Sequence, residues 1–418
     1  AAQRMLCLTT DPYTFGKYIL GYKDFTPSCH GVVADFFEST PHDSNLYLWP
    51  RGHFKTTLLT VSANIQRVLR NQEIQILIGS NKQENASSML NEIKGHLESP
   101  RLAQLFPEIL WPDPGRQAVE VWSAHSISVK RKQRRQVATI ETIGTEGELT
   151  SKHYDHHTFD DIVGKENSQT REQLEQTKEF LRHARQLSKP HTTRDLIGTT
   201  WHHSDVWADQ QARAAKGEIR CGVYKRACWE PCAPGDPLGD QVGGHGWVRP
   251  IFPERWSVPR LLLERDEIGD AVFNAQYLLN PLDESTAVFK RSAILPNIRP
   301  RDQFPRSEEM WLAITVDPAI SEQKWADFSA IAVGGFSREG FLYLLDIRRG
   351  RWSETELINQ IYDAYAAHPG VRVVGFEAVT FAKVYRYLFT AEGEKRNAYL
   401  PAIALQRTTR RNKEQRIM

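Results

Sequence analysis

Hydrophobic residues in the first half of the chain alternate between short strand-like runs and longer helical patterns. Residues 46–49 and 74–78 are apolar runs of strand length, and residues 85–97 have a helical pattern. Between the two runs, four apolar residues recur at helical spacing: Leu58, Val61, Ile65 and Leu69. Strands that alternate with helices in this way are typical of an α/β fold with a mainly parallel sheet.

The pattern continues with a strand end at 158–159, a polar helix over 168–187 and a strand at 195–198. Residues 154–158, which precede that strand end, are mostly polar, so the strand signal there is weak. We therefore expect an N-terminal α/β domain over residues 1–285, with a small insertion around residues 215–260.

A proline-rich, charged stretch separates this half from a second pattern. Residues 286–310 have the composition of a surface linker. The segments that follow predict three strands, a helix that opens with a capping box, and a fourth strand: 311–316, 330–333, 341–345, 353–367 and 371–376. An RNase H-like sheet begins in this order, so we expect an RNase H-like domain over residues 311–418.

Composition narrows the class of protein. The chain has 418 residues, enough for two or three domains at about 150 residues each. No apolar run approaches the roughly 20 residues that a membrane helix needs. Five cysteines is an odd count, so a reducing cytoplasm is expected rather than a disulfide framework. The net charge of +2 means that any positive field for nucleic acid must come from local patches.

A loop with phosphate-binding chemistry follows the first strand. In a P-loop, backbone N–H groups and a helix N-terminus hold phosphates, so Lys55 would reach the β- and γ-phosphates of ATP and Thr56 would bind Mg²⁺. Phe54 departs from the standard pattern, because a β-carbon limits how closely the backbone wraps a phosphate. A basic loop before a helix is the alternative interpretation. The candidate ATP-binding residues of the loop are Arg51, Gly52, His53, Phe54, Lys55 and Thr56.

Acidic residues further along the chain complete a possible ATPase site. Asp160 is a candidate Walker B carboxylate that binds Mg²⁺ through water, and Asp161 would orient the attacking water. Glu166 is the alternative catalytic base. Thr199, at the end of the next strand, would lie beside the γ-phosphate and sense its hydrolysis. An exposed acidic turn and a plain strand-to-loop junction are the alternatives.

The second domain has its own carboxylates at strand ends. Asp317 ends its first strand and Glu377 its fourth, and these strands are neighbours in the expected sheet. RNase H-like nucleases hold two metal ions with carboxylate oxygens, and one ion activates water. We therefore expect Asp317 and Glu377 to be catalytic and to bind Mg²⁺ or Mn²⁺. Turn capping is the alternative for a lone aspartate.

Two other features leave alternatives open. A basic run would hold DNA phosphates, and a solvated hairpin explains it equally well. Its cationic residues are Lys130, Arg131, Lys132, Arg134 and Arg135. The second feature is the pair Cys228 and Cys232, with Cys221 and His245 nearby in the sequence. Their spacing matches no common zinc site, which favours reduced thiols over zinc.

Taken together, these residues resemble the large terminase subunit of bacteriophages, which packages viral DNA. The stretches that carry the resemblance are 48–56, 159–162, 197–205 and 273–281. The last stretch is similar to the end of the family's ATPase domain, and the order and spacing match over nearly the whole chain. The family tolerates non-standard phosphate loops with a basic residue near the start, which suits Arg51 and lessens the objection to Phe54.

The resemblance implies an ATP-driven motor that moves double-stranded viral DNA into a procapsid and a metal-dependent endonuclease that cuts it. ATP with Mg²⁺ would be the cofactor, and Asp327 would be a further ligand of the nuclease metal. The implied partners are DNA, a portal protein, a small terminase subunit and further copies of this chain in a ring, in the host cytoplasm and without a membrane. An arginine would act across subunits, for which Arg134 and Arg135 are candidates and Lys152 is a weaker one.

A helicase-like ATPase without a packaging role and a catalytically inactive scaffold are the alternative functions. The stretch 275–281 and the single ATPase core favour the motor, whereas Phe54 and the polar strand before Asp160 favour the scaffold. The family's third nuclease acid follows well after the fourth strand, where the chain has only Glu392, Glu394 and Glu414. We therefore expect a C-terminally truncated chain with weak or absent nuclease activity.

Overall fold

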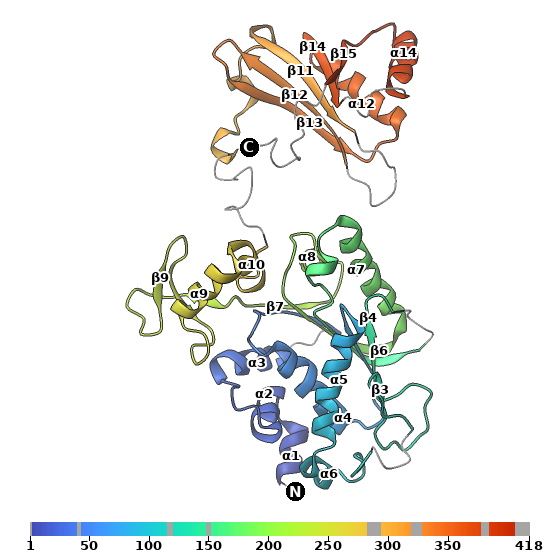
Figure 1. The fold of residues 1–418 in the computed structure, drawn as a ribbon, viewed down its shortest axis with the longest axis vertical. Coiled ribbons are helices and arrows are strands. Elements are labelled where there is room, and N and C mark those ends of the chain that lie inside the picture. The colour runs from blue at the N-terminus through green and yellow to red at the C-terminus, as the bar shows by residue number, and fades with distance from the viewer. Residues whose placement is uncertain are drawn as a thin grey trace. The chain divides into compact units, whose positions relative to one another are not determined.

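The computed structural model describes residues 2–39, 43–114, 120–147, 152–281, 294–318, 328–377 and 384–405. The chain divides into two compact units, Ala1–Thr286 and Ala287–Met418 (Figure 1). Among the described residues, no helix is both long and apolar enough to cross a membrane.

The first unit is built on a seven-stranded sheet with the strand order β3-β4-β2-β5-β6-β1-β7. Its strands are β1 (Ser44–Leu48), β2 (Ile76–Ser80), β3 (Ser126–Ile127), β4 (Ile140–Gly144), β5 (Tyr154–Asp160), β6 (Ser188–Gly198) and β7 (Gly222–Lys225). Neighbouring strands are parallel except for β3, which is antiparallel to β4. The predicted α/β fold with a mainly parallel sheet is therefore confirmed for this unit.

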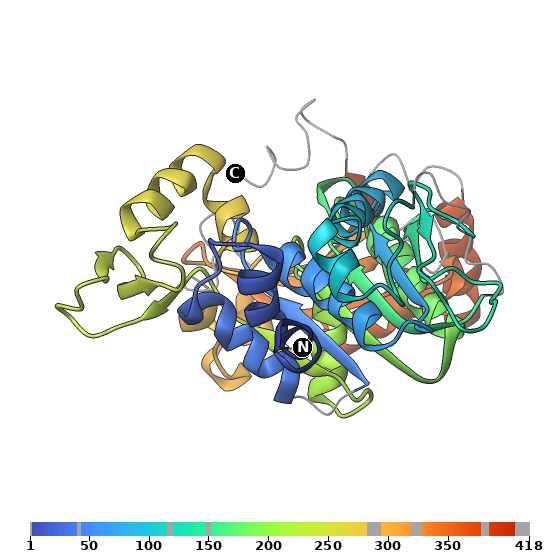
Figure 2. The same ribbon diagram turned by 90° about the horizontal axis from the view of Figure 1, so that it is seen from below.

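Helical segments cover both faces of this sheet (Figures 1 and 2). Those before β5 are α1 (Ala2–Thr9), α2 (Pro12–Phe15), η1 (Gly16–Leu20), η2 (Pro27–Gly31), α3 (Val32–Ser39), η3 (Thr56–Ser62), α4 (Ala63–Arg70), α5 (Gln83–Leu97) and α6 (Pro100–Leu105). Those after it are η4 (Lys165–Asn167), α7 (Arg171–Ala184), η5 (Arg185–Leu187), α8 (Val206–Ala215), α9 (Val258–Ile268) and α10 (Asp270–Gln276). A capping box between Thr170 and Gln173 starts α7, three residues later than the polar pattern predicted.

Apolar residues on the two sheet faces form separate cores. Ile76 and Ile78 of β2 pack with Ile65 of α4 on one face. Leu77 of β2 packs with Phe159 of β5 in the core on the other face. This follows from the strand period of two, because successive side chains point to opposite faces. The helix predicted after the first strand begins as a π-helical turn, η3, and continues as α4.

A small three-stranded sheet, in the order β8-β10-β9, is inserted after β7. Its strands are β8 (Trp229–Pro231), β9 (Asp240–Val242) and β10 (Gly246–Pro250). Because β7 belongs to the main sheet, the small sheet occupies the later part of the insertion expected around residues 215–260. With α9, the small sheet lies on the side of the unit away from β3 and β4 (Figure 2).

The second unit contains a five-stranded sheet in the order β13-β12-β11-β14-β15. Its elements are β11 (Met310–Asp317), β12 (Ser329–Ser337), β13 (Leu342–Gly350), α12 (Glu354–Ala367), β14 (Val371–Glu377), α14 (Val384–Arg396) and β15 (Ala402–Leu405), preceded by the short 3₁₀ turns η6 (Leu295–Asn297), η7 (Arg301–Gln303) and η8 (Ser307–Glu309). Strands β11, β12 and β13 pair in antiparallel fashion, and β14 and β15 run parallel to β11. The predicted capping box between Ser353 and Glu356 starts α12.

Candidate nucleotide site and candidate metal acids

Several strands of the first unit end around one loop. The loop after β1 leads into η3, and Trp49 N donates to Gly198 O at the end of β6 (3.2 Å). Asp161 lies between two other strand ends, because its N–H donates to Ile197 O (2.9 Å) and its carbonyl accepts from Asn81 N (3.2 Å). Parallel α/β sheets bind ligands at this carboxyl edge. We therefore take this edge as the candidate site.

Two loop residues and two acids meet at this edge. Lys55 Nζ lies 2.9 Å from Asp161 Oδ2, and the lysine side chain is only 9% exposed. Asp160 is fully buried, and Thr60 Oγ1 donates to its Oδ2 at 2.6 Å. The Thr56 side chain also lies near this carboxylate and acts to lower its pKa. A cation from the loop thus lies beside carboxylates from β5, the arrangement that a nucleotide bound with a metal ion requires.

The Asp160 carboxylate is in an unusual environment. Burial, reinforced by the adjacent Asp161 charge, raises the pKa of Asp160 to about 6, although Lys55 acts in the opposite direction. Asp160 Oδ1 and Asp161 Oδ1 are buried and have no hydrogen-bond partner within the described part of the chain. Buried carboxylate oxygens without donors suit a hard divalent cation such as Mg²⁺. The residues present therefore fit the implied metal.

Phe54 has a backbone conformation that explains how it replaces glycine. Its φ is +57°, in the left-handed region that glycine favours. Its ring packs against Phe25 and Phe252, with centroid distances of 6.3 and 6.1 Å. The Arg255 guanidinium lies 4.8 Å from the centroid of the Phe54 ring. These aromatic and cation–π contacts offset the left-handed strain, roughly 1–2 kcal/mol for a non-glycine residue.

His53 supports the loop from the protein interior. Its ring is fully buried and stacks on Trp256, with 6.1 Å between centroids and 10° between planes. Burial lowers the pKa of His53 to about 4, so the ring is neutral at pH 7. Gly52 has a φ of +75°, and a β-carbon there would lie 2.9 Å from the Trp256 ring. Trp256 is a site residue that sequence reasoning missed.

The end of α10 also holds the loop. Arg51 NH1 donates to Gln276 Oε1 (3.1 Å), and Arg51 N donates to Gln276 O (3.2 Å). Thr200 Oγ1 donates to Ala275 O at 2.6 Å, so the same segment contacts the loop after β6. Thr199 is buried beside it, only 4% exposed. Residues 275–276 therefore connect the loop after β1 to the loop after β6.

The rival catalytic base lies outside this cluster. Glu166 is 68% exposed, and its Oε2 pairs with Lys82 Nζ at 2.5 Å. Asp161 is the acid that lies beside Lys55. The structure thus brings together Lys55, Thr56, Asp160 and Asp161, and it leaves Glu166 in a separate exposed ion pair.

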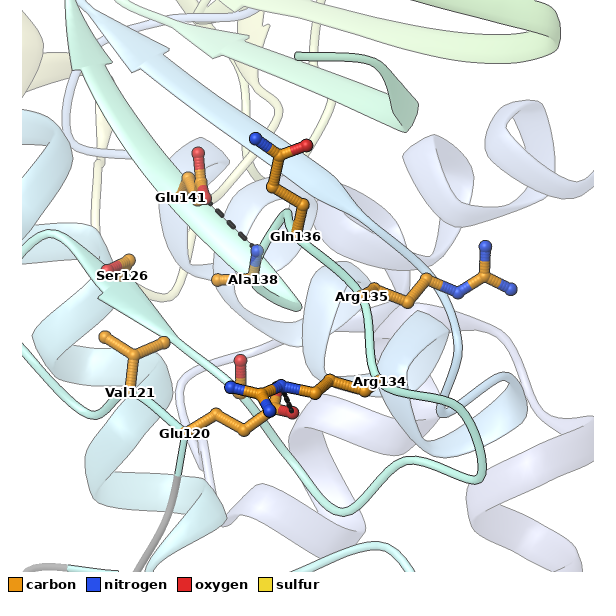
Figure 3. Close-up of a pocket in the computed structure, with 9 residues that line it drawn as sticks. Glu120, Val121, Ser126, Arg134, Arg135, Gln136, Ala138 and Glu141 are labelled. Carbon is orange, nitrogen blue, oxygen red and sulfur yellow. Dashed lines mark hydrogen bonds and ion pairs between the residues drawn. The ribbon is translucent and has the colours of Figure 1, made fainter.

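The basic run of residues 130–135 is not a continuous exposed patch. Arg131 turns inward, where Nε donates to Thr139 Oγ1 (3.1 Å) and NH1 donates to Val137 O (2.7 Å). Lys130 Nζ donates to Pro107 O at 2.7 Å. Arg134 is 94% exposed and pairs weakly with Glu120 (3.9 Å) at a surface cavity of about 640 Å³ (Figure 3).

The other cations of the run differ in their partners. Arg135 pairs with Glu73 at 3.6 Å, and its side chain extends away from Glu141 (Figure 3). Lys152, the third candidate for an arginine-like role across subunits, pairs with Glu141 at 2.9 Å. Lys132 is exposed. The run therefore exposes Lys132 and Arg134, and it exposes Arg135 in part.

The candidate zinc ligands are not gathered. Cys228 is buried, Cys221 and Cys232 are half-buried, and all are free thiols. Nowhere in the described ranges do three or more His, Cys, Asp or Glu residues form a group that could hold a metal ion. The thiol interpretation is therefore the one that the described residues support.

In the second unit, the register brings two predicted acids to neighbouring positions. Val316 of β11 pairs with Phe376 of β14, and Asp317 and Glu377 are the next residues on these parallel strands. The side chain of Glu377, like the whole of Asp327, lies outside the described residues. Glu392 on α14 forms ion pairs with Lys395 and Arg396, at 3.2 and 2.8 Å, within its own helix.

No protein-family model matches the chain, and no curated protein matches it. Among solved structures, the large terminase from a thermophilic bacteriophage aligns with a TM-score of 0.38 and 10% identity, over 93% of this chain and 83% of that chain. The same terminase in complex with ADP aligns with a TM-score of 0.38 and 10% identity, over 94% and 84% of the two chains. A structural similarity this distant does not support a functional assignment, so the function is inferred from the site itself.

Proposed function

We propose that the first unit hydrolyses ATP at the carboxyl edge of its sheet, as the motor of a DNA-packaging terminase. One observation carries this proposal: Lys55, Thr56, Asp160 and Asp161 meet at a loop that joins β1, an interior strand of the sheet, to a helix. Lys55 would bind the β- and γ-phosphates, and backbone N–H groups at the start of η3 would hold the remaining oxygens.

Mg²⁺, when bound, would neutralise phosphate charge and hold the β- and γ-phosphates in place. The Thr56 hydroxyl and the Asp160 carboxylate would hold it. Asp161 would accept a proton from the attacking water, whose oxygen forms a bond to the γ-phosphorus as the bond to the leaving ADP oxygen breaks. Thr199, buried at the end of β6, would report the loss of the γ-phosphate to the segment around residue 275.

A titration of ADP with and without Mg²⁺ tests this assignment. The wild-type chain should bind Mg²⁺-ADP more tightly than ADP alone. Asp160→Asn should abolish that difference while leaving metal-free binding intact, because the carboxylate holds the cation and not the nucleotide. Asp155→Asn, on the same strand but paired with Lys189, is the matched control. Equal Mg²⁺ enhancement in Asp160→Asn and the wild type would contradict the proposal.

We further propose that the second unit is RNase H-like and that Asp317 and Glu377 hold one nuclease metal ion, Mg²⁺ or Mn²⁺. The adjacent register of the two residues supports this. Asp327 is proposed as a third ligand. So few carboxylates hold metal ions weakly, so weak Mg²⁺- or Mn²⁺-dependent DNA cleavage is expected, and Asp317→Ala should abolish it. Cleavage that survives Asp317→Ala would contradict the assignment. Double-stranded DNA, a portal, a small subunit and a ring of copies are the partners of this proposed motor.

A helicase-like ATPase and a catalytically inactive scaffold are the remaining alternatives. The contact of Gln276 with Arg51 favours the motor, because it connects the segment that resembles the end of the terminase ATPase domain directly to the phosphate loop.

A further inference from the structure

A closed ring of side chains, all buried except the partly exposed Arg67, joins α4 to β5 and β6 behind the candidate nucleotide site. Asn64 Nδ2 donates to Thr158 Oγ1 at 3.0 Å, and Thr158 Oγ1 lies 3.1 Å from His156 Nε2. His156 Nε2 lies 3.4 Å from Asp195 Oδ2. Arg67 closes the ring, because NH2 donates to Asp195 Oδ2 (2.5 Å) and NH1 donates to Asn64 Oδ1 (2.9 Å).

The ring continues the contacts that hold Asp160. Residues 60, 64 and 67 share one face of the helical segment, and residues 156, 158 and 160 share one face of β5. The first contact between these faces is Thr60 to Asp160, and the second is Asn64 to Thr158. A single row of polar contacts therefore runs from the candidate metal ligand into the ring.

Because these contacts are buried, they restrict how α4 can move along β5. Asn64 and Thr158 are both fully buried. Apolar side chains tolerate small sliding movements, whereas a buried hydrogen bond that is stretched leaves polar groups without partners. The ring therefore fixes the position of α4 along β5. Because η3 and α4 are consecutive, it also fixes the distance of Lys55 and Thr56 from Asp160.

We infer that Asn64 and Thr158 are positioning residues for nucleotide hydrolysis, which act through α4 and β5 without touching the nucleotide. This inference rests on the proposed ATPase function. It assigns the polar side chains of β5 a role in catalysis: they set the geometry in which Thr56 and Asp160 share one Mg²⁺. Small displacements at such a site reduce the rate of the chemical step more than they weaken nucleotide binding.

Thr158→Val tests the inference, because valine keeps the shape of threonine and removes the hydroxyl that bonds Asn64 and His156. We expect kcat for ATP to fall on the order of tenfold with little change in KM for ATP, and we expect Mg²⁺ to enhance equilibrium ADP binding, measured without turnover, less than in the wild type. Thr158→Ser keeps the hydroxyl and should restore kcat. The matched control is Thr192→Val, which removes a buried hydroxyl of β6 that donates to Tyr154 O (2.7 Å) and is not a member of the ring.

Wild-type kcat in a folded Thr158→Val chain would overturn the inference. The inference would also be overturned if Thr158→Val and Thr192→Val lost kcat equally and Thr158→Ser did not restore it. If Thr158→Val fails to fold, Thr158→Cys, which keeps the size with a weaker hydrogen-bonding group, takes its place with the same expectations. Lys55→Ala separates the two claims. If ATPase activity survives in Lys55→Ala, the proposed function itself is wrong. If Lys55→Ala loses ATPase activity but Thr158→Val keeps the wild-type kcat, only this inference is wrong.

Discussion

Lys55 and Asp161 form an ion pair across the candidate nucleotide site, with 2.9 Å between Nζ and Oδ2. Asp161 reaches this position with a φ of +47°, a left-handed conformation that is uncommon outside glycine. Phosphates that enter the loop would compete with Asp161 for the lysine. Once the lysine binds phosphate, the Asp161 carboxylate is released at the place where an attacking water is expected.

Asp161→Asn should therefore separate binding from chemistry. Nucleotide affinity should rise, because Lys55 loses its competing partner, while kcat should fall by about 10²–10⁴-fold with the loss of the base. Steady-state hydrolysis and equilibrium nucleotide binding measure the two effects. Glu166→Gln is the control, and it should leave kcat near the wild-type value because an exposed ion pair contributes little. Loss of kcat in Glu166→Gln alone would reverse the assignment.

Phe54 offers a test of how the loop is held. Phe54→Ala loses the ring contacts and keeps a β-carbon at φ +57°, whereas Phe54→Gly loses the ring and also the strain. Both variants should be less stable than the wild type. Glycine should be the more stable of the two by roughly 1 kcal/mol, the reverse of its usual rank below alanine. Urea unfolding of the two variants measures this, and alanine ranking above glycine would argue against strain at Phe54.

The polar strand β5 shows where sequence reasoning reached its limit. The residues 154–158 gave a weak strand pattern, yet β5 lies at the centre of the sheet. Its polar side chains are buried because they bond residues on α4 and β6, which are distant in sequence: Asn64 and Asp195. A periodicity argument counts such residues as exposed, because it has no information about partners far away in the chain.

Sequence patterns formed by residues close in the chain predicted the structure more reliably than the pattern of β5 did. The strand–loop–helix context of Lys55 and the capping box at Ser353 depend on residues close in sequence, and both elements are present. Phe252 packs against Phe54, and Trp256 packs against Gly52. The two residues of each pair are about two hundred positions apart in the sequence, so these contacts form only in the folded chain. No motif in the sequence marked these aromatic residues.

Acid should destabilise the first unit through its buried histidines. Burial lowers the pKa of His157 from 6.5 to about 3. The unfolded chain therefore binds a proton that the folded chain does not between these pH values, so stability is full above pH 6.5 and falls as the pH falls toward 3. His157→Leu should reduce the slope of unfolding free energy against pH in this window by up to about 1.4 kcal/mol per pH unit.

Urea unfolding at several pH values measures that slope. The matched control is His191→Leu, whose ring is exposed on β6 and which should leave the slope unchanged. An unchanged slope in His157→Leu would show that the buried ring takes up its proton in the folded state.

The basic run should divide into DNA contacts and structural residues. Reversing the charges of the exposed Lys132 and Arg134 together should reduce the slope of log affinity against log salt by up to about 2 for double-stranded DNA. Arg131→Glu should instead destabilise the fold, because Arg131 donates to Thr139 and Val137 in the interior. A salt titration of DNA binding measures the slope. An unchanged slope would assign the run to a solvated loop.

The most direct test of the central claim is steady-state ATP hydrolysis by Lys55→Ala, compared with the wild type and with Lys82→Ala. Lys82 is a control of the same residue type near the same strand ends, but it is half exposed and paired with Glu166. Lys55→Ala should fold, by its urea unfolding transition, and hydrolyse no ATP, while Lys82→Ala should hydrolyse it at close to the wild-type rate. Hydrolysis near the wild-type rate by a folded Lys55→Ala chain would contradict the assignment of this loop as the site of ATP hydrolysis.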